Sequence, residues 1–486
     1  MKRGGTLVLA RQGEVTNLDP HKVPAFTSHR VFELVYSTLT RLGEDLSVQP
    51  DLAESWQLSP DGKQVTFKLR QAKFHNGDPL TSADVKFTFE RIINPDTKAV
   101  GQAFFTDLEK IDATDDRTVV FTLKRPNVAL LTYMAHPNAS IVSRKVTESA
   151  GGDLSKKEYA IGSGPFRLVE WVPDNYMRFD AFKDFYIQGQ PYLDGIRINI
   201  VPNETGLGAA LRTKAADMAL IVEPRTAQTL RNEQGIVVDA KPSLNPNVLL
   251  LQSKHKPFDN PKVRQAIAYA IDRKQLIDMV AFGEGEPTGP IPPSLRLYAL
   301  PTSEFDLYKR DLNKARQLLQ EAGVGSVEFT ILTQNTEPAY AKDIAQIVQQ
   351  QLSEIGIKAN IELMEFTQWV QRWLKADFEM APGLRSGQPD PDFYLYRYHA
   401  SDGNLKYVHG VENPKAAQAI EQARTTTDVQ KRKELYAIAQ RELVNDVSHI
   451  WLWVGRDYVG LLPTTKGFVH LPTGSIIYLR QTWLDK

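Results

Sequence analysis

Residues 50–92 read PDLAESWQLSPDGKQVTFKLRQAKFHNGDPLTSADVKFTFERI, in which turn residues separate short apolar runs. The Ser-Pro-Asp-Gly group at 59–62 predicts a tight turn, because proline presets one backbone angle and glycine accepts a positive one. Apolar and polar residues alternate over 65–69, as in a strand with one buried face. Thr81 then predicts the N-cap of a helix, where the charge of Asp84 favours the positive end of the helix dipole. These residues build a scaffold and carry no reactive group.

The composition is that of an ordinary globular protein with several domains. The 486 residues indicate about two to four domains at roughly 100–200 residues each. Apolar residues make up 42% and charged residues 24% of the chain. Basic and acidic residues number 58 each, so the net charge is zero, and no basic run occurs. Nucleic acid is therefore not expected as a partner.

The sequence contains no cysteine, which excludes disulfides, thiolate nucleophiles and cysteine-bound metals. No apolar run approaches the roughly 18 residues that span a bilayer. The chain begins MKRGGTLVL, without the apolar segment of a signal peptide. We expect the natural protein to carry an export segment ahead of this start.

The second half of the chain alternates strand and helix patterns. Apolar residues with a period of two at 327–332 and 357–363 predict strands, and an apolar face over 344–355 predicts a helix that ends at Gly356. A strand, a helix and a strand with short connections form a βαβ unit, which has parallel strands and a right-handed crossover.

The binding crevice of an open α/β sheet lies beyond the carboxyl ends of its strands. We expect three loops of the second half to lie there, namely those after Leu332, after Leu363 and over 384–392. Side chains of these loops are therefore the first candidates for ligand contact.

Several separated blocks of the sequence carry a family resemblance. They include residues 50–92, VTNLDPH at 15–21, IGSGPFRLVEW at 161–171 and FDNPKVRQAIAYAIDR at 258–273. Together they resemble the extracytoplasmic solute-binding proteins, family 5, of peptide- and nickel-type ABC importers, which include dipeptide- and oligopeptide-binding proteins. The resemblance extends over nearly all of the chain.

The resemblance implies an α/β, two-lobe periplasmic-binding-protein-like fold of class II, cluster C, with an extra subdomain inserted in the first lobe. The implied bounds are 1–38, 163–243 and 466–486 for the first lobe, 39–162 for the inserted subdomain and 244–465 for the second lobe. Proline-rich connections stand near both expected crossings between the lobes.

The sequence shows no catalytic pattern. It lacks a Gly-x-Ser-x-Gly elbow, a His-Glu-x-x-His helix and a phosphate loop with Gly-Lys-Ser/Thr. Among the nine histidines, the pairs His21 with His29 and His399 with His409 lack the i, i+4 spacing of a helical metal site. We expect no enzyme activity, no catalytic residue, no cofactor and no metal site. A hydrolase whose groups converge only in space is the alternative.

The loop GLRSGQPDPD at 383–392 departs from the pattern that the resemblance implies. In peptide-binding members, a Gly-Trp-x-x-Asp-x-x-(Asp/Glu)-Pro loop offers an aspartate to the free amine of the peptide. Aligned on the Asp-Pro pair at 390–391, that aspartate falls on Gly387, and the tryptophan falls on Leu384. A buried ammonium without its carboxylate keeps most of its desolvation penalty, on the order of several kcal/mol.

Two interpretations of this loop remain open. Either Asp390 or Asp392 replaces the missing anchor, or the solute has no free amine at this place. Arg385 favours the second interpretation, because its planar guanidinium suits a carboxylate, a phosphate or sugar hydroxyls. An exposed loop charge is the plain alternative for Arg385. Gly387 and Gln388 complete the candidate ligand-binding residues of the loop.

Four residues outside this loop are further candidates for ligand contact. Asn17 lies in a turn that either approaches the ligand or is a plain Asx-Pro turn. Glu223 follows an apolar strand and either receives a cationic group or stabilises a helix N-terminus. Asn245 and Asn247 stand at the expected lobe crossing, where they offer amides to a ligand or shape the linker.

The resemblance implies the solute-binding component of an ABC importer, which captures a peptide-like solute between two lobes by hinge closure. The implied partners are the small solute and the permease subunits of the transporter, and the protein itself is expected to be a monomer. The implied location is periplasmic or extracellular, with a lipid anchor as an option. An opine, an oligosaccharide or a metal chelate is the alternative solute.

Overall fold

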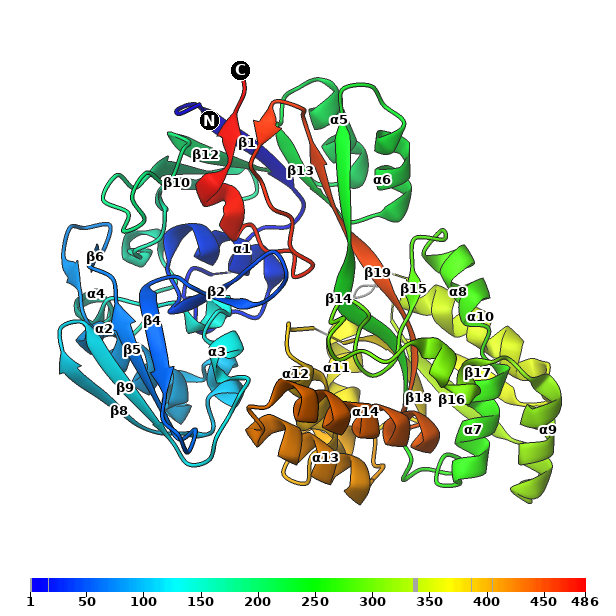
Figure 1. Cartoon of the computed structure of the whole chain (residues 1–486). Helices are drawn as coiled ribbons and strands as arrows, with labels where there is room; N and C mark the ends of the chain where they lie inside the picture. The colour runs from blue at the N-terminus through cyan, green and yellow to red at the C-terminus, as the bar shows by residue number, and fades with distance from the viewer. Residues whose placement is uncertain (1, 16, 335–339, 386, 404) are drawn as a thin grey trace. The chain divides into compact units, whose positions relative to one another are not determined.

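The computed structural model describes residues 2–15, 17–334, 340–385, 387–403 and 405–486. The chain forms two compact units, unit 1 from Met1–Lys241 with Asp457–Lys486 and unit 2 from Pro242–Arg456. Strands β14 (Val237–Leu251) and β19 (His449–Leu461) carry the chain between the units and are neighbours in one sheet (Figure 1). The lobe and subdomain boundaries implied by the family resemblance stay a prediction.

Unit 1 combines a mixed sheet, a smaller antiparallel sheet and short helices. Its strands are β1 (Thr6–Arg11), β2 (Thr40–Leu42), β3 (Val48–Pro50), β4 (Ala53–Leu58), β5 (Gln64–Leu69), β6 (Ala72–Lys73), β7 (Pro79–Leu80), β8 (Leu108–Asp115), β9 (Thr118–Leu123), β10 (Phe166–Val172), β11 (Tyr176–Ala181), β12 (Gly195–Ile200), β13 (Met218–Ile221), β20 (Thr465–Lys466) and β21 (Trp483–Leu484). Its helices are α1 (Phe26–Val35), α2 (Ser82–Ile93), α3 (Leu130–Tyr133), α4 (Arg144–Ser149), α5 (Glu204–Arg212) and α6 (Pro224–Arg231).

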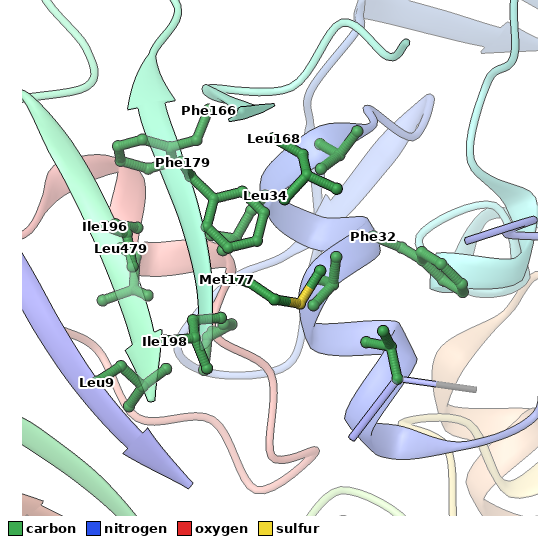
Figure 2. Packing of buried hydrophobic residues seen from close by; sticks show 14 of the residues in the cluster. Leu9, Phe32, Leu34, Phe166, Leu168, Met177, Phe179, Ile196, Ile198 and Leu479 are labelled. Atoms are coloured by element: carbon green, nitrogen blue, oxygen red, sulfur yellow. The ribbon is translucent and has the colours of Figure 1, made fainter. Parts of the chain in front are cut away.

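Strand β1 holds the centre of the large sheet of unit 1. It pairs in parallel with β12 and β13, and β13 pairs antiparallel with β19. Every second side chain of such a strand faces the same side, so the sheet offers helix α1 one apolar face. Figure 2 shows Ile198 and Met177 on the strands that face helix α1. Apolar packing joins them with Leu9 of β1 and with Leu34 and Phe32 of α1 in one buried cluster. This core fixes the carboxyl ends of β1 and β13.

The strand, turn and helix pattern of residues 50–92 is confirmed. Strands β4 and β5 pair antiparallel across a turn in which Gly62 has a φ of 67°. The apolar residues of β5 are buried and its polar ones are more exposed. Thr81 and Asp84 form a capping box at the start of α2, as the sequence predicts. The sheet continues through β9 to β8.

Unit 2 carries the remaining strands and longer helices. Besides β14 and β19, its strands are β15 (Glu286–Pro287), β16 (Glu328–Thr333), β17 (Lys358–Leu363) and β18 (Met380–Leu384). Its helices are α7 (Pro261–Ala270), α8 (Arg273–Val280), α9 (Leu312–Glu321), α10 (Ala341–Ser353), α11 (Phe366–Leu374), α12 (Pro391–His399), α13 (Pro414–Thr425) and α14 (Val429–Asp446).

The βαβ pattern of unit 2 is confirmed. Strands β16 and β17 pair in parallel from Glu328 opposite Lys358 to Thr333 opposite Leu363, and α10 connects them. Strand β18 runs parallel to β16 and antiparallel to β14. The carboxyl ends of β16, β17 and β18 therefore share one edge of the sheet, and the loop after β18 begins there.

Helices α12, α13 and α14 pack together in unit 2, drawn in brown and orange in Figure 1. Each begins with an aspartate or asparagine that caps the first turn, at Asp390, Asn413 and Asp428. Within the described part of the chain, no helix has the length and hydropathy needed to cross a bilayer.

Candidate ligand-binding site

The loop that follows β18 is tied to strand β14. Val248 lies opposite Gly383 and Asn247 lies opposite Leu384 in the antiparallel pair. The N–H of Arg385 continues the pairing, since it donates to the carbonyl of Pro246 at 2.9 Å. These backbone hydrogen bonds fix the position of the Cα of Arg385 relative to β14. Of the loops predicted to lie at the crevice, residues 335–339 and 386 are outside the described residues.

Gly387 is buried against the backbone of β14. Its N–H donates to Oδ1 of Asn245 at 2.7 Å. A Cβ at this position would lie 1.9 Å from the carbonyl oxygen of Leu244 and 2.2 Å from the hydroxyl of Tyr394, far inside contact distance. The glycine is therefore required by close approach, and no side chain at 387 can reach a solute without displacing β14 or α12.

This packing bears on the family alignment, which places a peptide-anchoring aspartate at 387. The φ of Gly387 lies outside the positive range, so the backbone conformation itself would accept another residue. The space for a Cβ is filled, however, and this excludes a side chain. Asn245 consequently acts on the loop itself, through Gly387, and shapes the crossing strand.

Asp390 and Asp392 each have a buried arginine partner. Asp390 is 5% exposed, and its carboxylate accepts from Nη1 and Nη2 of Arg432 at 2.9 and 2.7 Å. Asp392 is 1% exposed, and its Oδ2 lies 3.1 Å from Nη1 of Arg424. Burial is the largest single influence on the pKa of Arg432 and lowers it, but the charge and hydrogen bonds of Asp390 together with the neighbouring tyrosines raise this pKa above its usual value.

The two ion pairs join helices α12, α13 and α14. A solute amine that took either carboxylate would leave an arginine buried without its carboxylate, a loss of about 3–5 kcal/mol. This geometry disfavours the interpretation in which Asp390 or Asp392 replaces the missing anchor. Gln388 lies half-buried between this pair and Gly387, and its contact with a solute stays a prediction.

Arg385 is a half-buried cation that no carboxylate neutralises among the described residues. Its Nη2 lies 2.5 Å from Nε2 of His449, and its guanidinium carbon lies 3.9 Å from the ring centre of Tyr398. Trp373 is the next aromatic ring, at 5.7 Å. Burial lowers the pKa of Arg385, and Tyr398 opposes part of that shift. A partly desolvated guanidinium of this kind is a strong site for an anionic group.

Three histidines from distant segments surround this arginine. The ring centres of His399, His409 and His449 lie 4.7 to 5.5 Å apart. Burial holds the pKa of His399 and of His449 well below the usual range and lowers that of His409 to about 4. From the sequence, His399 and His409 were considered as a possible metal-binding pair. No sequence pattern indicated that His449 joins them, because it lies 40 residues after His409.

No group of three or more histidine, aspartate or glutamate side chains in the described ranges is arranged to hold a metal ion. Nε2 of His409 donates to the carbonyl of Tyr398 at 2.5 Å, and its Nδ1 accepts from the N–H of Val411 at 3.1 Å. Both nitrogens of His409 are thus engaged with the backbone.

Asn247 offers a free acceptor inside unit 2. It is 1% exposed, and its Nδ2 lies 3.4 Å from the carbonyl oxygen of Trp453. Its Oδ1 is buried without a hydrogen-bond partner. A buried amide oxygen without a partner is costly by roughly 1–3 kcal/mol, so it is suited to accept from a bound solute or from water.

In unit 1, Glu223 stands at the N-cap of α6 with an exposed side chain that makes no capping hydrogen bond. Beside it, Glu204 accepts from the N–H of Val222 at 3.0 Å and from Nε2 of Gln12 at 2.7 Å. Burial raises the pKa of Glu204, and the charge of Glu223 adds to the shift. The sequence missed Glu204, because its partners are 18 and 192 residues away along the chain.

Asn17 belongs to an Asx turn in unit 1, since its Oδ1 accepts the N–H of Asp19 at 2.7 Å. Asp19 is fully buried and pairs with Arg91 of α2 at 2.6 Å. The turn thus has a structural partner of its own. Ligand contact by Asn17 stays a prediction, and residue 16 lies outside the described residues.

Comparison with known proteins identifies the family of this chain. Residues 47–406 match the pattern of the bacterial extracellular solute-binding proteins, family 5 Middle. The glutathione-binding protein GsiB of Salmonella typhi is 30% identical over 457 residues, which are 89% of this chain and 86% of that protein. GsiB of Escherichia coli K12 is 29% identical over 457 residues, with 89% and 86% covered.

Solved structures agree with this assignment. DppA of Helicobacter pylori, solved with the peptide STSA, has a TM-score of 0.84 and 27% identity, and the match covers 100% of this chain and 99% of that one. AgaA of A. tumefaciens R10, solved with agropinic acid, has a TM-score of 0.83 and 26% identity over 99% of both chains. The α/β two-lobe fold predicted from the sequence is confirmed. The chain belongs to family 5 of the bacterial extracellular solute-binding proteins.

Proposed function

We propose that this chain is the solute-binding component of an ABC importer and that it binds a small, peptide-like solute carrying an anionic group. Family membership supports the first part, and the relatives named for glutathione or solved with a peptide support the second. The solute is held between the two lobes by hinge closure. The permease subunits then recognise the closed form and receive the solute. The protein acts outside the cytoplasm as a monomer, in the periplasm or held by a lipid anchor.

Arg385 is the observation that carries the choice of solute. The position that gives other family members their amine anchor is Gly387, which has no room for a side chain. Two residues earlier, Arg385 is partly exposed and has no carboxylate partner among the described residues. The loop therefore favours an anion where the family pattern favours an amine, and a carboxylate can take a bidentate pair from the guanidinium.

Glutathione has the chemistry that this site favours. It is a small peptide with two carboxylates, and it is the solute in the names of the GsiB relatives. We infer that a glutathione-like peptide places one carboxylate on Arg385. Asn247 then supplies a buried acceptor for an amide N–H of the same solute.

Native mass spectrometry of the purified protein tests the solute class first, because a solute that co-purifies is identified by its mass. Calorimetric titration follows with glutathione, its dimethyl ester and the peptide STSA. We expect glutathione to bind more tightly than the ester, because the ester has lost both anionic groups. Equal affinity for the acid and the ester would rule out an anionic anchor while leaving the transport role intact.

We further propose that the protein has no catalytic turnover. The sequence motifs for nucleophilic, metal-dependent and phosphoryl-transfer chemistry are missing, and the relatives are solute-binding proteins. Incubation with panels of peptides, esters, phosphates and glycosides should leave every substrate intact. Saturable hydrolysis that a point substitution abolishes would contradict this proposal.

A further inference from the structure

The imidazole of His449 lies against the guanidinium of Arg385. Nη2 of Arg385 lies 2.5 Å from Nε2 of His449. A guanidinium has only donors, so Nε2 must accept and cannot carry a proton. The remaining proton of a neutral imidazole therefore resides on Nδ1, which is buried without a hydrogen-bond partner. His449 is 3% exposed, so solvent does not replace that partner.

The surroundings of His449 contain aromatic rings and cationic or titratable nitrogens. Helix α12 contributes Tyr398 and His399, whose ring centres lie 6.2 and 5.5 Å from that of His449. The segment after residues 406–408 contributes His409 at 5.1 Å, and β19 itself contributes Trp451 at 5.5 Å. Arg385 approaches from the end of β18.

More distant charges have the same sign. Arg264 of α7 acts on His409, and Arg397 of α12 acts on Arg385. The charged groups that act on His449 are Arg385, His409 and His399, so none of them is acidic. Protonation of His449 would place a second cation beside Arg385 and remove its acceptor. Burial, followed by the charge of Arg385, accordingly holds the pKa of His449 well below its usual range.

The ring of Tyr398 and the imidazole of His449 hold Arg385 from two directions. Tyr398 lies under the guanidinium at 3.9 Å, and His449 accepts from one of its amino groups. His409 supports the first contact, since it donates to the backbone carbonyl of Tyr398 at 2.5 Å. A long arginine side chain loses much of its rotamer freedom when it is fixed. A site that fixes it in advance removes that penalty from solute binding.

We propose that His449 is the positioning residue for solute binding, which through its neutral Nε2 holds the guanidinium of Arg385 against Tyr398. The inference rests on the proposed function, in which Arg385 receives an anionic group of the solute. It adds one requirement for solute binding to those that Arg385 imposes: the imidazole of His449 must remain uncharged. Binding of an anionic solute is therefore weakened when acid protonates His449.

Two substitutions separate positioning from packing. His449→Phe keeps a ring of similar size and removes the acceptor, and we expect it to weaken glutathione binding about tenfold at neutral pH. His449→Gln keeps an acceptor that does not titrate, and we expect it to restore most of the affinity. His75→Phe replaces a buried histidine of unit 1, whose Nε2 lies 3.0 Å from the carbonyl oxygen of Gly164, and should leave affinity unchanged.

The pH profile supplies the decisive readout. Glutathione sulfonate is used as a second probe, because a sulfonate stays ionised in acid. We expect wild-type affinity for both probes to stay constant through about pH 6.5, where an ordinary histidine titrates, and to fall only in more acidic solution, because the pKa of His449 is held well below that range. The Gln variant should lose much less affinity in the more acidic solution. A wild-type profile as flat as that of the Gln variant would overturn the inference.

A measurement without any solute covers the case in which neither probe binds. Nitrogen-15 NMR of labelled histidines reports which ring nitrogen carries the proton, and the His449→Phe spectrum assigns the signal. We expect His449 to be neutral with its proton on Nδ1 at neutral pH, and Arg385→Ala to change that signal. A proton on Nε2, or a charged ring, would overturn the inference.

The outcomes also separate the inference from the proposed function. If Arg385→Ala weakens glutathione binding and His449→Phe does not, the anchor stands and the positioning role is wrong. If neither substitution affects the binding of a solute, the anionic anchor at Arg385 is wrong and the inference falls with it.

Discussion

Two charged regions of unit 2 lie within a few residues of each other and handle charge in opposite ways. Asp390 and Asp392 are paired with arginines of α14 and α13 and are almost fully buried. Arg385 shares its guanidinium with an imidazole and an aromatic ring and meets no acid among the described residues. The difference shows that the ion pairs of Asp390 and Asp392 join helices. The charge of Arg385, which no described acid neutralises, remains available to an anionic group.

Breaking a paired charge should have the largest effect, and it should fall on stability. Asp390→Ala leaves Arg432 buried without its carboxylate, so we expect a loss of about 3–5 kcal/mol in the free energy of unfolding. Denaturant unfolding measures this change. Glu434→Ala, an exposed position on the same helix as Arg432, should change stability by less than about 0.5 kcal/mol. A loss no larger than in the control would show that the pair does not hold these helices together.

Removing the unneutralised charge should affect binding. Arg385→Ala is expected to weaken the binding of an anionic peptide by about 1.5–3 kcal/mol, the range for a hydrogen bond to a charged group. Stability should change little, because the guanidinium carries a desolvation penalty with no ion pair in return. Calorimetry with the wild type and with Arg296→Ala, an exposed arginine of the same unit, provides the comparison. Equal affinities in all three proteins would contradict an anchor at Arg385.

Gly387 sharpens the comparison, because it lies between the two regions. Gly387→Ala forces a methyl group against the carbonyl of Leu244, and we expect a loss of about 1–3 kcal/mol in stability. Gly387→Asp should be destabilising for the same reason and should not create an amine site. Gly325→Ala is the matched control, since nothing lies near the added Cβ and φ is not positive there. Unchanged stability in Gly387→Ala would show that the loop can move away from β14.

The smallest expected effect concerns pH and the buried histidines. The pKa of His449 in the folded protein lies below the value of about 6.5 in the unfolded chain, so the unfolded state takes up the proton first on acidification. The stability that neutral His449 contributes is present above that pH and is lost as the pH falls.

Between about pH 6 and pH 5, the wild type should lose about 1 kcal/mol more stability than His449→Phe. Denaturant unfolding at both pH values measures the difference. Identical pH dependence of the wild type and His449→Phe would mean that His449 titrates normally in the folded protein.

Local sequence rules predicted the elements of the fold where neighbours along the chain determine them. The alternation in β5, the capping box of Thr81 and Asp84 and the parallel pair β16 and β17 all follow from periodicity and capping within short windows. The family blocks extended this to the two-lobe class, which the comparisons confirm. The sequence also indicated that the loop at 383–392 departs from its relatives and that Arg385 favours an anion.

Only the tertiary structure decided what the residues of that loop can do. Whether Asp390 and Asp392 are free depends on Arg432 and Arg424, which are 42 and 32 residues away along the chain. The space at Gly387 depends on Leu244, and the partner of Arg385 is His449, 64 residues further along. Sequence determines propensity and pattern within a few residues, whereas charge compensation, free volume and protonation depend on groups that only folding brings together.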